Sequence, residues 1–209
     1  MWNKIEQIRI HILGLALFLS LNDSLVYLNI GGFKAKGYQI LVLLFLLPIR
    51  YVDKKSLLFF SLFNIGLLGS CYRGSMLGAS TADILANIVK LEMFALFVLN
   101  IASVTTVYEQ RRYLFKWIYC GALFSSVYGI IQFLGFNLFH FVLPGNPESA
   151  ILGEHLLKRV YSFFPEPNWF SLQLMMALPL VFFVARGSRG RMLGFLIILL
   201  AIILSMSRG

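Results

Sequence analysis

The sequence predicts an all-α polytopic membrane protein with about seven membrane-spanning helices, from its charge content and the grouping of its apolar residues. Hydrophobic residues make up 59% of the chain and charged residues only 13%, whereas a soluble domain carries about a quarter charged residues. The apolar residues form long blocks separated by short basic loops. Such blocks are predicted to be helices, because a helix in lipid satisfies its own backbone hydrogen bonds.

Seven apolar segments are predicted to form these helices within one transmembrane domain, residues 1–209. They lie near residues 10–29, 38–49, 56–70, 83–107, 114–136, 168–185 and 192–206. The first segment is predicted to stay as a helix rather than to be removed as a signal peptide, because no cleavage site is evident before Asn22 and Asp23. Pro179 is expected to kink the sixth helix.

The basic residues at the helix ends predict a cytoplasmic N-terminus. One set of ends carries eleven Lys and Arg residues and the opposite set carries six. Because positive residues remain in the cytoplasm, the richer set is predicted to be inside, and the long loop 137–167 then faces outward. The net charge of +9 is therefore attributed to orientation in the lipid bilayer, and no nucleic-acid partner is expected.

The outer loop contains a predicted amphipathic helix. On a helix of residues 148–160, Leu152, Leu156 and Val160 fall on one side, and charged or polar residues fall on the other. This pattern suits a helix that lies in the membrane–water interface. His155 and Arg159 are four residues apart and share its polar face.

A proline-rich turn follows and leads into the sixth helix. Pro165 and Pro167 flank Glu166 and exclude regular helix there. Asn168 is expected to cap the sixth helix, whose free N–H groups form a natural anion site. An arginine beside such a helix end is suited to phosphate. The alternative that Arg159 and Lys158 only meet lipid headgroups stays open.

Three motifs in this part of the chain resemble a known family. The run Arg159-Val160-Tyr161-Ser162-Phe163-Phe164-Pro165-Glu166-Pro167-Asn168 resembles the "Arg, short gap, Phe, Pro-Asn" signature of the bacterial O-antigen ligase and polymerase superfamily. Tyr128-Gly129-Ile130-Ile131-Gln132 is similar to the family's Tyr-Gly-x-x-Gln pattern, and Ser207-Arg208-Gly209 is similar to its Ser-Arg-Gly. The resemblance is strongest over residues 120–209.

The resemblance implies part of a C-type membrane glycosyltransferase bundle at the outer face of the bacterial inner membrane. Such enzymes assemble O-antigen or exopolysaccharide from glycan carried on undecaprenyl pyrophosphate, and use neither metal nor cofactor in the ligase branch. Polymerases transfer the glycan to another lipid-linked repeat unit, and ligases transfer it to lipid A–core. The Phe-x-Glu-Pro-Asn motif, residues 164–168, is more similar to the polymerase branch.

The resemblance also assigns roles to residues. Arg159 and Arg208 match the arginines that hold the donor pyrophosphate, and Asn168 with Pro167, Ser207 and Lys158 is expected to shape the substrate site. Family members are about twice as long and carry a catalytic His in a later outer loop. This chain is therefore expected to be the N-terminal half of such an enzyme, working with other polysaccharide assembly proteins.

The remaining candidates each have a simpler explanation. His155 and Glu166 could act as a local base, but a solvated helix face for His155 and a loop-ordering carboxylate for Glu166 are the favoured explanations. Lys90 lies inside the fourth helix, where it either snorkels outward or lines a cavity for the lipid carrier. Asn100 and Gln132 are expected to form hydrogen bonds between helices rather than to contact substrate.

Two other classes of function stay open at this point. A transporter or permease fragment would show discontinuous helices or repeated halves around a midplane site. Lys90 and Glu92 are the midplane candidates, and no repeat is evident in the sequence. A non-catalytic, truncated relic of a larger gene would show neither sugar transfer nor solute flux.

Overall fold

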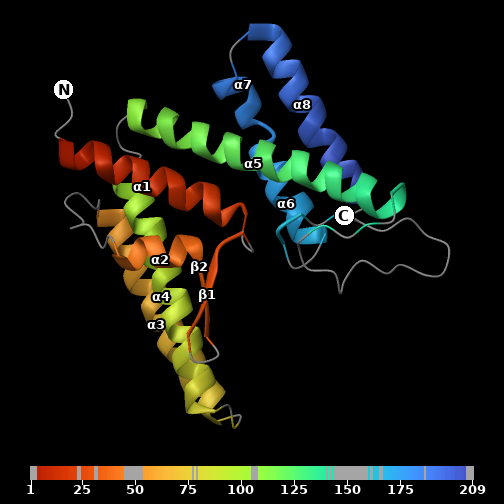
Figure 1. The fold of residues 1–209 in the computed structure, drawn as a ribbon. Helices are drawn as coiled ribbons and strands as arrows, with labels where there is room; N and C mark the ends of the chain where they lie inside the picture. The colour runs from red at the N-terminus through yellow and green to blue at the C-terminus, as the bar shows by residue number, and fades with distance from the viewer. Residues whose placement is uncertain are drawn as a thin grey trace. The chain divides into compact units, whose positions relative to one another are not determined.

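The computed structural model describes a predominantly helical chain with one short β-hairpin (Figure 1). The residues that it describes are 4–22, 25–30, 33–44, 54–76, 78, 80–104, 108–139, 141, 143, 160, 162–164, 167–185 and 187–205. Four of its helices are long and apolar enough to cross a membrane: Lys54–Met76, Glu109–Asn137, Pro167–Val184 and Gly187–Leu204. The helical membrane architecture is therefore supported, although these described spans number fewer than the predicted seven.

The structure contains eight helices and two strands among the described residues. They are α1 (Lys4–Ser20), β1 (Tyr27–Ile30), β2 (Phe33–Lys36), α2 (Gly37–Leu44), α3 (Lys54–Met76), α4 (Thr81–Val104), α5 (Tyr108–Asn137), α6 (Pro167–Ala177), α7 (Leu180–Val184) and α8 (Gly187–Leu204). The third, fourth, fifth and seventh predicted helices correspond to α3, α4, α5 and α8.

The prediction that the first helix continues to residue 29 is wrong. Helix α1 ends at Ser20, and the antiparallel pair β1 and β2 follows. Asn22 is buried, and its Nδ2 donates to the carbonyl oxygen of Phe18 at 2.8 Å. Side chains of this type compete with the helical backbone for hydrogen bonds. The polar residues that follow Leu21 therefore end the helix where hydropathy alone would extend it.

The chain divides into two compact units. The first comprises Met1–Ala16 and Leu28–Arg111, and the second comprises Leu17–Tyr27 and Arg112–Gly209. Within the first unit, α4 packs against both α3 and α2. The guanidinium Nη2 of Arg9 donates to Oδ1 of Asn100 at 3.4 Å. Asn100 thus bonds to another helix, as predicted for the polar groups within the spans.

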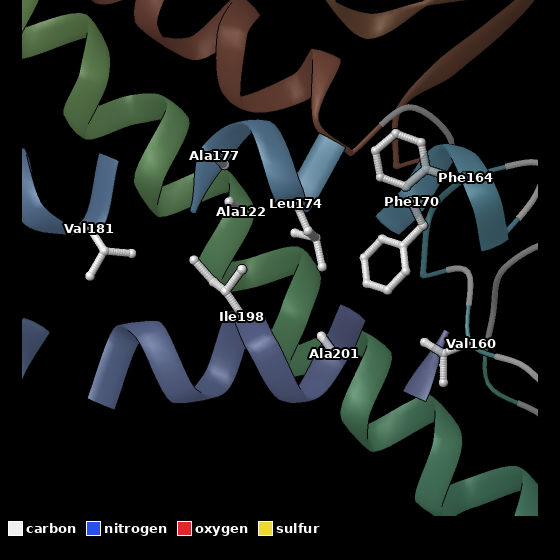
Figure 2. Close-up of a cluster of buried hydrophobic side chains, with 9 residues drawn as sticks. All are labelled: Ala122, Val160, Phe164, Phe170, Leu174, Ala177, Val181, Ile198 and Ala201. Carbon is white, nitrogen blue, oxygen red and sulfur yellow. The ribbon is translucent and has the colours of Figure 1, made fainter. Parts of the chain in front are cut away.

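The core of the second unit is built by α5, α6, α7 and α8 (Figure 2). The buried side chains of this core are all apolar, and they are Ala122, Val160, Phe164, Phe170, Leu174, Ala177, Val181, Ile198 and Ala201. Gly194 of α8 lies against the ring of Tyr119 of α5, where a β-carbon would collide with the phenol. The small residue therefore permits close contact between these two helices.

Pro179, which is predicted to kink the sixth helix, lies where that helix is interrupted. Helix α6 ends at Ala177 and α7 begins at Leu180, and together they make up the candidate span Pro167–Val184. Proline has no backbone N–H, and its ring collides with the carbonyl four residues earlier, which together explain the break.

The predicted orientation is testable with engineered cysteines at the ends of two spans. In a chain carrying Cys71→Ser and Cys120→Ser, we expect Ser75→Cys, exposed at the end of α3, to react with a membrane-impermeant maleimide in intact spheroplasts. Ser188→Cys, exposed at the start of α8 among arginines, should react only after permeabilisation. Labelling of Ser188→Cys in intact cells together with protection of Ser75→Cys would reverse the orientation.

Candidate functional site

The structure describes only part of the residues predicted for the site. Pro167, Asn168 and Lys90 are described, whereas His155, Lys158, Arg159, Glu166, Ser207 and Arg208 lie outside the described residues, as does the predicted amphipathic helix. Within the motif of residues 159–168, the structure describes Val160, Ser162, Phe163, Phe164, Pro167 and Asn168. These residues and the helices α5 and α6 that they contact form the candidate site.

One face of α5 carries the residues that receive this segment. Ser125, Tyr128, Gly129 and Gln132 are spaced by three, four and seven positions, which places them together on one side of a helix. Ser125 and Gln132 are fully buried although both are polar. Buried polar side chains of this kind need hydrogen-bond partners, and Ser162 supplies them.

Ser162 forms three hydrogen bonds with this face. Its backbone N–H donates to Oε1 of Gln132 at 2.9 Å. Its hydroxyl donates to the carbonyl oxygen of Ser125 at 3.0 Å, and the two hydroxyl oxygens lie 2.9 Å apart. Because the single hydroxyl proton of Ser162 goes to the carbonyl, the Ser125 hydroxyl must donate to Ser162. The backbone N–H and the hydroxyl of Ser162 are both thereby hydrogen-bonded to α5.

The backbone at Ser162 has an unusual conformation. Its φ angle is +51°, in the left-handed region that residues with a β-carbon rarely occupy. Such a conformation costs about 1–3 kcal/mol and persists only where the surroundings over-determine it. The bonds to Ser125 and Gln132 supply that constraint. The turn is therefore held by α5 rather than by local preference.

Aromatic and aliphatic side chains seat the residues on both sides of Ser162. The Phe163 ring stacks on Tyr128, with centroids 4.2 Å apart and planes inclined by 19°. A β-carbon on Gly129 would lie 2.8 Å from Cγ1 of Val160 and 3.0 Å from Cζ of Phe170. Glycine at position 129 therefore permits the close approach of Val160 and Phe170 to α5. Each named position of the Tyr-Gly-x-x-Gln pattern, residues 128, 129 and 132, contacts this segment or Phe170.

The start of α6 adjoins this arrangement through Phe170. Its ring contacts that of Phe164, with centroids 5.9 Å apart, and both side chains are buried (Figure 2). Helix α6 begins at Pro167, a residue suited to the first position of a helix. Asn168 is exposed and lies in the first turn, so it does not occupy the predicted capping position.

The Gln132 side chain retains an amide nitrogen with two unused N–H donors among the described residues. Its Oε1 accepts from Ser162, so its Nε2 is the free end, and this atom is buried without a partner among the described residues. The hydroxyl of Ser126 is likewise buried and unpaired there. An unpaired buried amide costs about 1–3 kcal/mol. Ser126 is therefore a natural control for substitutions at Ser125, whose hydroxyl is bonded to Ser162.

Arg159 is three residues before Ser162 and Glu166 is four residues after it, so the bonded turn lies between the predicted charged residues in the sequence.

Lys90 lies apart from these residues in sequence and belongs to the first unit. It is exposed on α4, and Glu92 is partly buried. Its exposure does not decide between the two predictions for Lys90, which are snorkelling outward and lining a cavity for the lipid carrier. Within the part of the chain that the structure describes, His, Cys, Asp and Glu form no group of three that could hold a metal ion.

Comparisons of the chain with protein-family models, curated proteins and solved structures found no match. The resemblance to O-antigen ligases and polymerases therefore rests on the three sequence motifs alone. The prediction that Gln132 bonds to another helix is wrong, because its Oε1 accepts from the backbone N–H of Ser162, which lies between α5 and α6. The sequence did not indicate Ser125 or Ser162, although Ser125 lies two helical turns from Gln132 and Ser162 lies inside the signature.

The hydroxyl pair of Ser125 and Ser162 is expected to contribute about 0.5–1.5 kcal/mol to stability, as buried neutral hydrogen bonds do. A double-mutant cycle of Ser125→Ala and Ser162→Ala, read as thermal stability in detergent, should show coupling in this range. Ser126→Ala, at an unpaired hydroxyl, should cost less than Ser125→Ala. Strictly additive single mutants would contradict the assigned bonds.

Gly129→Ala is expected to destabilise the second unit by about 1–3 kcal/mol, because the new methyl group overpacks a buried contact. The added carbon would lie against Val160, so Val160→Ala should relieve part of the loss in the double variant. Stability measured by heat-induced aggregation checks both effects. If the two substitutions add without any relief, then Gly129 does not approach Val160 closely.

Proposed function

We propose that the chain is a membrane glycosyltransferase of O-antigen or exopolysaccharide assembly, which transfers glycan from undecaprenyl pyrophosphate at the outer face of the bacterial inner membrane. The observation that supports this proposal is the contact between two separate motifs. The Tyr-Gly-x-x-Gln pattern of α5 binds Ser162 and Phe163, which lie inside the second motif. Motifs that meet through their own residues behave as one structural unit.

The proposed roles follow from the chemistry of the leaving group. The acceptor hydroxyl attacks the anomeric carbon, the bond to the pyrophosphate oxygen breaks, and the pyrophosphate leaves with that electron pair. Arg159 and Arg208 bind the pyrophosphate, and fixed cations stabilise its growing charge more in the transition state than in the ground state. The hydroxyl proton passes to a base, for which His155 and Glu166 are the candidates in the outer loop.

The buried turn contributes by positioning rather than by contact with substrate. Ser162 is bonded to α5 and lies three residues from Arg159 in the sequence, and the role proposed for this anchor is to position the arginine for the donor. Preorganised donors need no rearrangement during reaction, and small misplacements of such groups lower rates strongly. The proposal leans toward a polymerase, because the Phe-x-Glu-Pro-Asn sequence is closer to that branch.

The transporter alternative gains little from the structure. Its expected sign was a discontinuous helix, and the break between α6 and α7 is such a feature. Pro179 accounts for that break, and the core residues that flank it, Ala177 and Val181, are apolar. The break is therefore explained by packing without a transported solute.

Arg159→Ala and Arg208→Ala, each tested in the gene's full natural context, are expected to lower polymer formation by about 100-fold or more, the usual effect of removing one oxyanion-stabilising donor. Arg159→Lys should form polymer at a level between those of Arg159→Ala and the unsubstituted enzyme, since an ammonium keeps the charge but loses the bidentate hydrogen bonding. The measurement is the glycan ladder on gels of cells that lack the chromosomal copy. Immunoblots should show unchanged membrane levels.

Arg189→Ala is the matched control, because Arg189 is exposed at the start of α8 on the predicted cytoplasmic side. It should leave the ladder unchanged. Accumulation of lipid-linked repeat units in the Arg159 and Arg208 variants would support a block in transfer. A normal ladder from either variant would remove the role proposed for that arginine.

A further inference from the structure

A groove of about 330 Å³ runs between α3 and α4 in the first unit. Its walls come from the first half of α3 and the second half of α4. Phe59, Phe60 and Phe63 line one side, Phe94 and Val98 line the other, and Lys55 lies at one end. The volume is within the range of sites that bind small molecules, and the lining is apolar apart from that end.

The groove opens toward the surroundings of the chain rather than into its core. Helix α3 is one of the candidate spans, and only 6% of its most apolar window is buried. Phe59 is 65% exposed and Phe94 is 49% exposed, although both line the groove. A span with this little burial is expected to face lipid. The molecules that first reach the groove are therefore lipids.

The charge at the end of the groove selects among lipids. Lys55 lies in the first turn of α3, and Lys54 precedes it. Free N–H groups and the positive end of the helix dipole lie at the same position. Along α3 the groove extends from Lys55 to Phe63, about 12 Å at 1.5 Å per residue. An apolar channel with a cationic end complements an acyl chain that carries an anionic headgroup.

We propose that this groove binds an anionic phospholipid, with one acyl chain between α3 and α4 and the headgroup phosphate at Lys55. The positive residues at this end predict that it faces the cytoplasm, and anionic lipids give that leaflet its negative surface potential. The site does not depend on the proposed transfer reaction, whose arginines are predicted at the opposite face. Either proposal can therefore fail without the other.

The test places a fluorescent probe in the groove of the full chain. Phe63→Trp is reconstituted in nanodiscs that contain brominated phosphatidylglycerol or brominated phosphatidylcholine at equal mole fraction. The signal of the three native tryptophans is removed by subtracting the same measurement on the unsubstituted chain. We expect brominated phosphatidylglycerol to quench the added tryptophan at least twice as strongly as brominated phosphatidylcholine.

Two charge variants identify the source of that preference. Lys55→Gln should equalise quenching by the two lipids, because the cation at the end of the groove is lost. Lys116→Gln removes an exposed charge from α5 and should leave the preference unchanged. Phe94→Trp places a second probe on the opposite wall and should report the same preference if Phe63→Trp does not insert into membranes.

Two results would overturn the proposal. Equal quenching of Phe63→Trp by the two lipids, with Lys55 unchanged, would mean that the groove is an unselective lipid-facing surface. An absence of quenching by either lipid would mean that protein covers the groove, such as a second copy of this chain.

Discussion

The hydrogen bond from the Ser162 backbone to the Gln132 side chain is the constraint on which the second unit's candidate site depends. It joins residues 30 positions apart, both fully buried. Without that acceptor, the buried N–H would lack a partner at a cost of about 1–3 kcal/mol. The hydroxyl bonds to Ser125 and the stacking of Phe163 on Tyr128 then fix the chain on either side.

The same contact links packing to the proposed chemistry. Ser162 and Phe163 have no reactive role in the proposal, yet they lie between Arg159 and Glu166 in sequence. Anchoring the middle of this motif on α5, a candidate membrane span, fixes one point of the segment that contains the charged residues. The proposed function therefore rests on α5 as the scaffold, with the arginines as the groups that meet the pyrophosphate.

Hydropathy predicted the helices well, because long apolar blocks in lipid have few alternatives to the helix. It placed the end of the first helix too late, since Asn22 ends α1 through a side-chain bond that an average over residues does not register. The turn at Ser162 was not predictable in the same way. Its left-handed backbone depends on Gln132, a partner distant in sequence. Motif resemblance located the region, and long-range hydrogen bonds explain its shape.

The most direct test of this account is hydrogen exchange at residues 160–164 in the full chain, reconstituted in nanodiscs and followed by mass spectrometry. The account predicts slow exchange in the unsubstituted chain, because the Ser162 N–H is buried and bonded to Gln132. Gln132→Leu should raise the exchange rate of this segment and leave α8 protected. Exchange as fast as in an unstructured peptide, before any substitution, would contradict the central claim that α5 holds this turn.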